Sequence, residues 1–366
     1  MTPSLLTAHL ARRAGTLGLC LLPWLPLQAI AVDARSTAAP SAVSTPDYSI
    51  WISNESTGEV LVMEEPTHHI ATRIAVGRRP RGLIYAAGQV FVAVTGSPSA
   101  APTVDPSTLP PADKSADGIV VIDALSRQIQ RVLRVASDPE IIAVNAAGTE
   151  LYVASEDTGQ VVVIDTRTGQ LQASLNVGAE PEGVTLSPRG EIALAASEAD
   201  GTVSWIDTRT RRVLGTVKVG LRPRGVCFSR DGRQAYVAVE SGHAVVALDV
   251  AQRRVRLTRE LLPGERPMTV LPSWDDAHLY VSTGRGKTVL ALNPIDLSTQ
   301  SSVEVGIRPW GLALSPDGRA LYSANGPSGT VSIIDTADFT VTTVITTDGQ
   351  PWGVTPVPDH HTIATP

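Results

Sequence analysis

Short apolar segments separated by polar turns recur along almost the whole chain. A typical unit contains the apolar run "GLALS", the polar turn "PDGR", and two further runs, "LYSANG" and "TVSIIDT". A turn rich in Thr, Arg or Gly then leads to a fourth run, such as "LQASLNVG". The runs are short and rich in β-branched residues, which is typical of β-strands. We find no sustained 3.6-residue apolar period after the N-terminal segment, so the pattern predicts an all-β fold.

A proline-containing turn marks the start of each unit and gives the period of the repeat. The seven prolines are Pro80, Pro139, Pro181, Pro223, Pro267, Pro309 and Pro351. The intervals between them are 59, 42, 42, 44, 42 and 42 residues. Four antiparallel strands in each such unit, repeated seven times, predict a seven-bladed β-propeller. Five units have Gly two residues after the proline, which would let the innermost strands crowd the axis.

The two ends of the repeat predict how the ring closes. The repeat enters at "YSIWISNE", which matches the second strand of a unit, and leaves with "PWGVTPVP", which matches only a first strand. The C-terminal strand should therefore complete the blade begun by residues 49–76. This closure removes the open sheet edges. We assign the propeller to residues 48–358 and a tail to residues 359–366.

One long interval comes from an insertion at residues 96–118, "GSPSAAPTVDPSTLPPADKSADG". Its Pro, Ser and Ala content predicts a loop without regular structure. Long loops in compact domains are usually functional or disordered. The insertion is accordingly either a lid or only a disordered segment.

The first residues have the pattern of a secretory signal peptide, which we assign to residues 1–31. Arg12 and Arg13 precede an apolar stretch that ends in the small-x-small sequence Ala29-Ile30-Ala31. Two alternatives are an uncleaved membrane anchor and a lipoprotein signal at Cys20. Residues 32–47 are expected to form a flexible segment. We therefore expect an exported, periplasmic protein.

The composition narrows the possible partners. Cleavage after residue 31 would remove two arginines and no acid, taking the formal charge from −6 to −8. An acidic protein is a poor binder of nucleic acid. Cys227 would be the one remaining cysteine, so no intramolecular disulfide is expected. The remaining chain has no further apolar run of membrane length, and we expect a monomer without membrane insertion.

Antiparallel connectivity places the proline turns on one face of the ring, together with the turns between second and third strands. In ring order, the residues after the prolines are Trp352, Arg81, Glu140, Glu182, Arg224, Met268 and Trp310. The acids that follow the second strands lie on the same face, and they are Glu55, Glu156, Glu198 and Glu240. An acidic sector would thus face an aromatic sector across the axis, with arginines between them.

Because this face departs from its own repeat consensus, we predict that it carries a binding site. The candidate residues are Arg81, Glu140, Glu182, Arg224, Met268, Trp310, Trp352, Glu156, Glu198 and Glu240. An arginine–tryptophan surface suits a flat anionic group. The alternative is that the charges are solvated rim residues and that the tryptophans pack on their neighbours.

Motifs for catalysis or cofactor binding are missing from the sequence. There is no C-x-x-C-H for a haem and no G-x-S-x-G elbow. The histidine pairs lack metal-ligand spacing with carboxylates. "TGRGKT" (283–288) lacks the Walker spacing and precedes a strand rather than a helix. We predict no catalytic residue, no metal site and no cofactor.

The repeat resembles the YVTN-type seven-bladed propeller repeat. The segment "GLALSPDGRALYSANGPSGTVSIIDTADFTVTTV" (311–344) matches its pattern nearly throughout, and the resemblance covers residues 48–358. More narrowly, the chain resembles the exported β-propellers associated with PQQ-dependent catabolism. That resemblance implies an accessory protein in the periplasm that acts with a quinoprotein alcohol dehydrogenase, its cytochrome or a linked transporter.

Three classes of function follow as hypotheses. The first is a non-catalytic binding or accessory protein that recognises a protein partner of that system or a small anionic ligand at the channel mouth. The second is a lactonase-type hydrolase, in which Glu156, Glu198 and Glu240 would serve as metal ligands or a base. The third is a surface-adhesion or nucleic-acid module.

Overall fold

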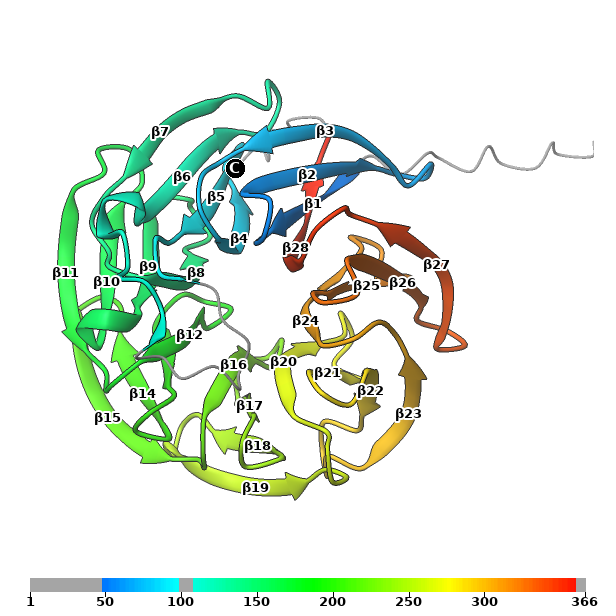
Figure 1. Ribbon diagram of the computed structural model, residues 1–366. Helices are drawn as coiled ribbons and strands as arrows, with labels where there is room; N and C mark the ends of the chain where they lie inside the picture. Colours follow the sequence, from blue (N-terminus) through cyan, green and yellow to red (C-terminus); the bar gives the residue numbers. More distant parts are fainter. Residues whose placement is uncertain (1–47, 99–107, 360–366) are drawn as a thin grey trace, which may run out of the picture. The chain divides into compact units, whose positions relative to one another are not determined.

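The computed structural model describes residues 48–98 and 108–359 of the 366-residue chain. The predicted signal peptide 1–31, the segment 32–47 and most of the tail lie outside the described residues, as do residues 99–107 of the insertion. The described residues form seven four-stranded antiparallel sheets arranged as a β-propeller (Figure 1). This confirms the predicted fold. Among these residues we find no helix with the length and hydrophobicity that a bilayer crossing requires.

Each blade runs from an innermost strand at the channel to an outermost strand at the rim. The first two blades are β28 (Pro351–Pro358), β1 (Tyr48–Asn54), β2 (Glu59–Glu64), β3 (His69–Ala75), and β4 (Pro80–Ala86), β5 (Gln89–Val94), β6 (Gly118–Asp123), β7 (Ile129–Leu133). The next two are β8 (Pro139–Val144), β9 (Glu150–Ser155), β10 (Gln160–Asp165), β11 (Leu171–Asn176), and β12 (Pro181–Leu186), β13 (Ile192–Ser197), β14 (Thr202–Asp207), β15 (Arg212–Lys218). The last three are β16 (Pro223–Phe228), β17 (Gln234–Val239), β18 (Ala244–Asp249), β19 (Arg254–Glu260); β20 (Pro267–Pro272), β21 (Leu279–Thr283), β22 (Thr288–Leu292), β23 (Thr299–Glu304); and β24 (Pro309–Leu314), β25 (Ala320–Asn325), β26 (Thr330–Asp335), β27 (Thr340–Thr346).

The ring closes as the sequence predicts. Strand β28 pairs antiparallel with β1, with Tyr48 opposite Pro358 and Asn54 opposite Pro351. The innermost strands β28, β4, β8, β12, β16, β20 and β24 neighbour one another around the axis. Apolar clusters fill the spaces between blades; one of them joins Trp205 of β14 to Val237 of β17. The core is therefore distributed between neighbouring blades rather than gathered in one centre.

A β-bulge at the start of the innermost strand recurs in every blade. In β4, Pro80 pairs with Val94 and Leu83 with Val92, so that two residues, Arg81 and Gly82, face one residue of β5. Equivalent register shifts follow the other six turn prolines. Such a bulge re-aims a side chain. It turns the residue after each proline towards the central channel.

The glycine in the bulge is required by close approach of the next blade. A Cβ on Gly82 would lie 2.7 Å from the carbonyl oxygen of Glu140, and one on Gly183 would lie 2.1 Å from that of Arg224. Because these distances are shorter than any real Cβ contact, a larger residue would push the blades apart. The predicted crowding of the innermost strands is confirmed.

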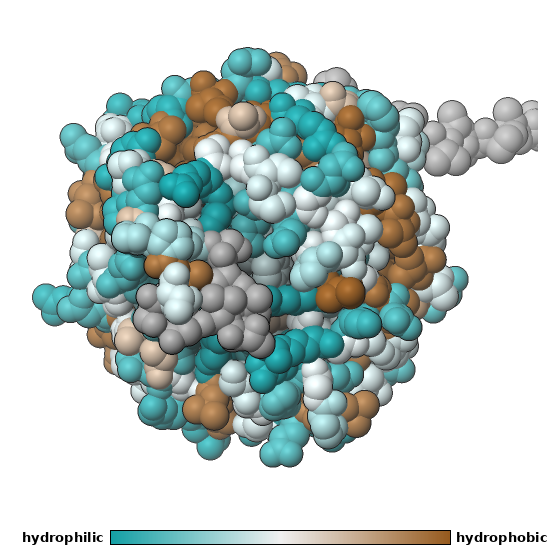
Figure 2. Space-filling model, viewed as in Figure 1, coloured by the Kyte–Doolittle hydropathy of each residue, from teal (hydrophilic) through white to brown (hydrophobic). Residues whose placement is uncertain are grey.

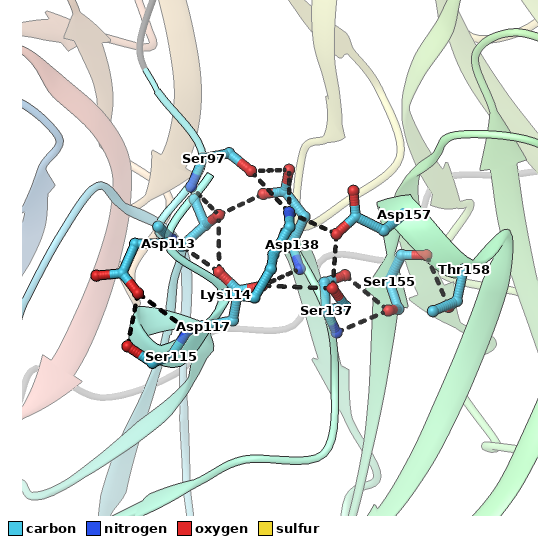
Figure 3. Close-up of polar contacts among 12 residues, drawn as sticks. Ser97, Asp113, Lys114, Ser115, Asp117, Ser137, Asp138, Ser155, Asp157 and Thr158 are labelled. Carbon is cyan, nitrogen blue, oxygen red and sulfur yellow. Dashed lines mark hydrogen bonds and ion pairs between the residues drawn. The ribbon is translucent and has the colours of Figure 1, made fainter. Parts of the chain in front are cut away.

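The described ends of the insertion are fixed to the blade that follows. Asp117 accepts hydrogen bonds from the backbone N–H of Gly96 at 2.7 Å and of Asp138 at 2.9 Å. Lys114 pairs with Asp157 at 2.6 Å (Figure 3). Lys114–Ala116 form a short 3-10 turn, η2, so the prediction that the whole insertion lacks regular structure is wrong for its C-terminal part. The reason is local, because the Asp113 side chain accepts from Ser115 N and caps the turn.

Candidate binding site at the mouth of the channel

The proline turns present two side chains per blade at one end of the central channel. The residue after the proline lies in the bulge, and the residue before it is in the left-handed region in five blades. These five residues are Arg79, Asp138, Glu180, Arg222 and Arg308, with φ between 42° and 56°. Non-glycine residues in this region are strained, and such strain gathers at functional sites.

An outer cavity of about 590 Å³ lies at this mouth. Its lining within the described chain is strongly basic, with seven arginines against two glutamates. The arginines are Arg79, Arg81, Arg222, Arg224, Arg266, Arg285 and Arg308, and the glutamates are Glu55 and Glu240. Met268, Trp310 and Trp352 complete much of the apolar wall. Figure 2 shows hydrophilic side chains gathered around the centre of the ring.

A smaller, mainly apolar chamber of about 140 Å³ lies deeper in the channel. Its walls include the bulge glycines Gly82, Gly225, Gly311 and Gly353, together with Leu83, Leu312 and Val354. Four residues line both spaces, and they are Arg224, Met268, Trp310 and Trp352. All four were predicted as site residues, and the structure places them as a collar between the outer cavity and the inner chamber.

Arg81 and Arg224 lie in a network of buried carboxylates. Arg81 pairs with Glu140 at 2.5 Å and lies 3.6 Å from Glu182. Arg224 pairs with Glu182 at 2.7 Å, and at 2.9 Å with both Glu198 and Glu240. The acidic sector is therefore neutralised by arginines rather than presented to a ligand. It holds the two arginines in place beneath the mouth.

The buried glutamates divide into ionised and protonated groups. Burial opposes the ionisation of Glu182, but Arg224 and Arg81 outweigh it and lower its pKa to about 2. Burial and the charge of Glu182 raise the pKa of Glu198 to about 8. Burial, with Glu182 and Asp138 nearby, raises the pKa of Glu156 to about 7. The network consequently gains and loses protons near neutral pH.

The two tryptophans both pack and line the site. Their ring centroids are 6.0 Å apart with the planes tilted by 51°, and Met268 joins the same cluster. Trp310 is 9% exposed and Trp352 is 8% exposed. Arg308 lies over Trp310 at 5.0 Å and Arg81 over Trp352 at 4.9 Å. Within the described chain, Trp310 Nε1 has no hydrogen-bond partner.

Three carboxylates gather at one edge of the network, and of these the sequence analysis predicted Glu140 and Glu156 as site residues but not Asp138. Asp138, Glu140 and Glu156 each offer an oxygen, and these atoms lie within 4.8 Å of one another. Three carboxylate oxygens are ligands that a hard divalent cation accepts. Asp138 also accepts hydrogen bonds from Thr95 and Ser97, both at 2.5 Å. These bonds hold its carboxylate in position.

The basic residues Arg266, Arg285 and Arg308 were also missed as site residues. Arg266 and Arg308 precede turn prolines and share the face predicted for the site. Arg285 lies in the "TGRGKT" turn between β21 and β22, which lacks the spacing of a phosphate loop. The turns between second and third strands lie on the same face as the proline turns, and this rule of antiparallel connectivity could have identified Arg285 as a site residue.

Comparison with solved structures agrees with this architecture. A functionally unknown protein from Desulfotomaculum acetoxidans is similar with a TM-score of 0.70 and 14% identity, over 86% of this chain and 100% of that chain. A putative 6-phosphogluconolactonase from Bacteroides uniformis gives 0.68 and 18%, over 85% and 99%. Dihydro-heme d1 dehydrogenase gives 0.61 and 12%, over 87% and 77%. No protein-family model and no curated protein matches the chain. Similarity at these identities shows the fold alone, and the protein is a seven-bladed β-propeller.

Proposed function

We propose that this protein is a non-catalytic binding protein whose ligand is a flat, polyanionic molecule held at the mouth of the channel. The observation that carries the proposal is the outer cavity, where seven arginines face two glutamates beside a pair of tryptophans. Its volume of about 590 Å³ lies in the range of small-molecule sites.

The chemistry of the lining selects this class of ligand. Guanidinium groups offer planar, two-pronged contact to carboxylates and also stack on flat rings. Tryptophan adds a large apolar contact area at small entropic cost. Arg81 and Arg224 are held by buried glutamates, so part of the basic wall is organised before a ligand arrives. Preorganisation of this kind lowers the cost of binding.

The biological setting that we propose is quinoprotein alcohol oxidation in the periplasm. The YVTN-type repeat, the resemblance to PQQ-associated propellers and the signal-like N-terminus support it. The quinone cofactor PQQ is flat and anionic, and these are the properties that the lining of the outer cavity favours. An accessory protein could bind the cofactor itself or an acidic group on a dehydrogenase, cytochrome or transporter.

Calorimetric titration of the purified protein tests the proposal. We expect PQQ and the planar tricarboxylate trimesate to bind, and the uncharged trimesate trimethyl ester to bind at least tenfold more weakly. The double change Trp310→Ala and Trp352→Ala should weaken binding at least tenfold, about 1.4 kcal/mol. Trp274→Ala is the matched control, since Trp274 is half exposed and lies in the turn between β20 and β21, at the opposite end of the blade from the proline turn. Equal affinity for acid and ester would overturn the proposal.

A lactonase-type hydrolase is the second candidate, favoured by one observation. The carboxylates of Asp138, Glu140 and Glu156 lie close enough to share a cation, and solved neighbours include putative 6-phosphogluconolactonases. Glu198 and Glu240, however, are paired with Arg224 and are not free to bind a metal or act as a base. Hydrolysis of 6-phosphogluconolactone with added calcium, abolished by Glu156→Gln, would establish this activity.

A further inference from the structure

The arginines of the outer cavity divide into two groups by their partners. Four of them have a carboxylate oxygen within 2.8 Å, and these ion pairs are Arg79–Glu55, Arg81–Glu140, Arg222–Glu198 and Arg224–Glu182. Their guanidinium groups already contact carboxyl groups of the protein, so they have fewer donors left to offer a ligand.

The second group lies on two adjacent blades and is poorly balanced. Arg266 lies 3.8 Å from Glu240, whose carboxylate already accepts from Arg224 at 2.9 Å. Neither Arg285 nor Arg308 makes an ion pair with any residue that the structure describes. All three side chains line the outer cavity, from the turns around β20, β21 and β24. Positive charge is thus concentrated on one side of the mouth.

Arg308 is partly buried among charges of both signs. Burial lowers its pKa; of the neighbouring charges, Glu240 opposes this most strongly, while Arg224 and Arg285 lower the pKa further. An anion between these side chains would remove the repulsion. The buried indole N–H of Trp310 also lacks a hydrogen-bond acceptor in the described chain, and an anion could supply one. Arg308 lies over the ring of the same tryptophan.

We propose that Arg266, Arg285 and Arg308 form an anion seat that takes one oxyanion group, a carboxylate or a phosphate, of the planar ligand, whose ring then contacts Trp310. This proposal rests on the proposed binding function and adds the position and orientation of the ligand's charge. The paired arginines on the other side of the mouth shape the cavity, and the seat supplies the donors that are free to hold the anion.

The test compares the double variant Arg285→Gln and Arg308→Gln with Arg319→Gln. Arg319 has an 89% exposed side chain and precedes β25, at the end of the blade away from the proline turn, so it is the control for loss of an arginine outside the seat. We expect trimesate to bind the double variant at least tenfold more weakly, with a smaller salt dependence, and to bind the control normally. Without ligand, the double variant should melt at the same or a higher temperature than the parent, because like charges have been removed. Titration with inorganic phosphate alone separates a phosphate seat from a carboxylate seat.

The possible failures are distinguishable. If trimesate binds the parent and the double variant equally, while the tryptophan double variant loses binding, the anion seat is wrong and the proposed function stands. If neither PQQ nor trimesate binds, yet phosphate raises the melting temperature of the parent and not of the double variant, the seat is right and the proposed ligand class is wrong. A double variant that melts far below the parent, with no anion effect, overturns the seat as well.

Discussion

Deletion of residues 351–366 should open the ring, because β28 is the innermost strand of a blade that it shares with β1, β2 and β3. The deletion leaves the Tyr48–Asn54 strand as an unpaired edge facing the axis. It also exposes apolar surface on the strands of the neighbouring blade, which pack against Val354. The whole protein, and not only one blade, should lose stability.

The magnitude follows from the side chains that β28 buries. Trp352 and Val354 are each 8% exposed, and Val357 is 1% exposed. A fully buried apolar side chain contributes roughly 1.5–3 kcal/mol, so these three contribute about 5–9 kcal/mol. The total stability of a folded protein is typically about 5–15 kcal/mol. The truncated chain should therefore be close to, or below, the limit of stable folding.

Thermal and urea denaturation followed by circular dichroism measure this loss. A chain that lacks only residues 360–366 is the matched control, since it keeps β28, and it should melt like the full chain. A synthetic peptide of residues 351–366 added to the truncated protein should restore much of the melting temperature. If the truncated protein melts like the full chain, the reasoning on ring closure is refuted.

Three further changes probe the blade contacts, the carboxyl network and the insertion. Gly183→Ala should lower the free energy of unfolding, measured with urea, by about 1–3 kcal/mol, because its Cβ would meet a backbone oxygen of the next blade at 2.1 Å. Gly215 has open space around it, so Gly215→Ala should have little effect. Equal effects of the two changes would contradict the close approach. The pKa of Glu198 is raised from 4.5 to about 8, so its protonated form stabilises the fold below about pH 4.5, and this stability is lost progressively as the pH rises to about 8. The melting temperature should fall over this range, and less so in Glu198→Gln; a melting temperature that rises would count against it. Asp117→Ala should speed proteolysis within residues 96–118 without a large change in melting temperature, because Asp117 ties the backbone N–H of Gly96 to that of Asp138 in the next blade. An unchanged cleavage rate would show that other contacts fix the insertion.

The fold could be predicted in detail because each blade repeats the same local chemistry. The turn proline, the glycine two residues later and the aspartate at the end of the third strand recur, and each has one structural role. Asp165, for example, ends β10 and accepts from the backbone N–H of Thr168 at 2.7 Å, which fixes the following turn. Closure could be predicted too, because a first strand was missing at one end of the repeat and present at the other.

The site was only partly predictable, because charge pairing depends on side chains that reach across blades. The sequence places Glu140 and Glu182 at the mouth, but it does not show which carboxylate each long arginine side chain reaches. Arg81 crosses to Glu140 in the next blade, and the acids become internal partners of the arginines. The sequence equally could not show that Trp310 and Trp352 pack together and line a cavity at the same time.

The bulge that follows each turn proline separates recognition from architecture. Backbone pairing resumes in register after it, so the residues on either side of the proline can differ between blades while the sheets remain alike. Each blade thus contributes an interchangeable pair of residues to a shared rim. A new specificity can arise by exchange of these flanking residues, or by duplication of a blade that carries a useful pair, without a change in the sheets.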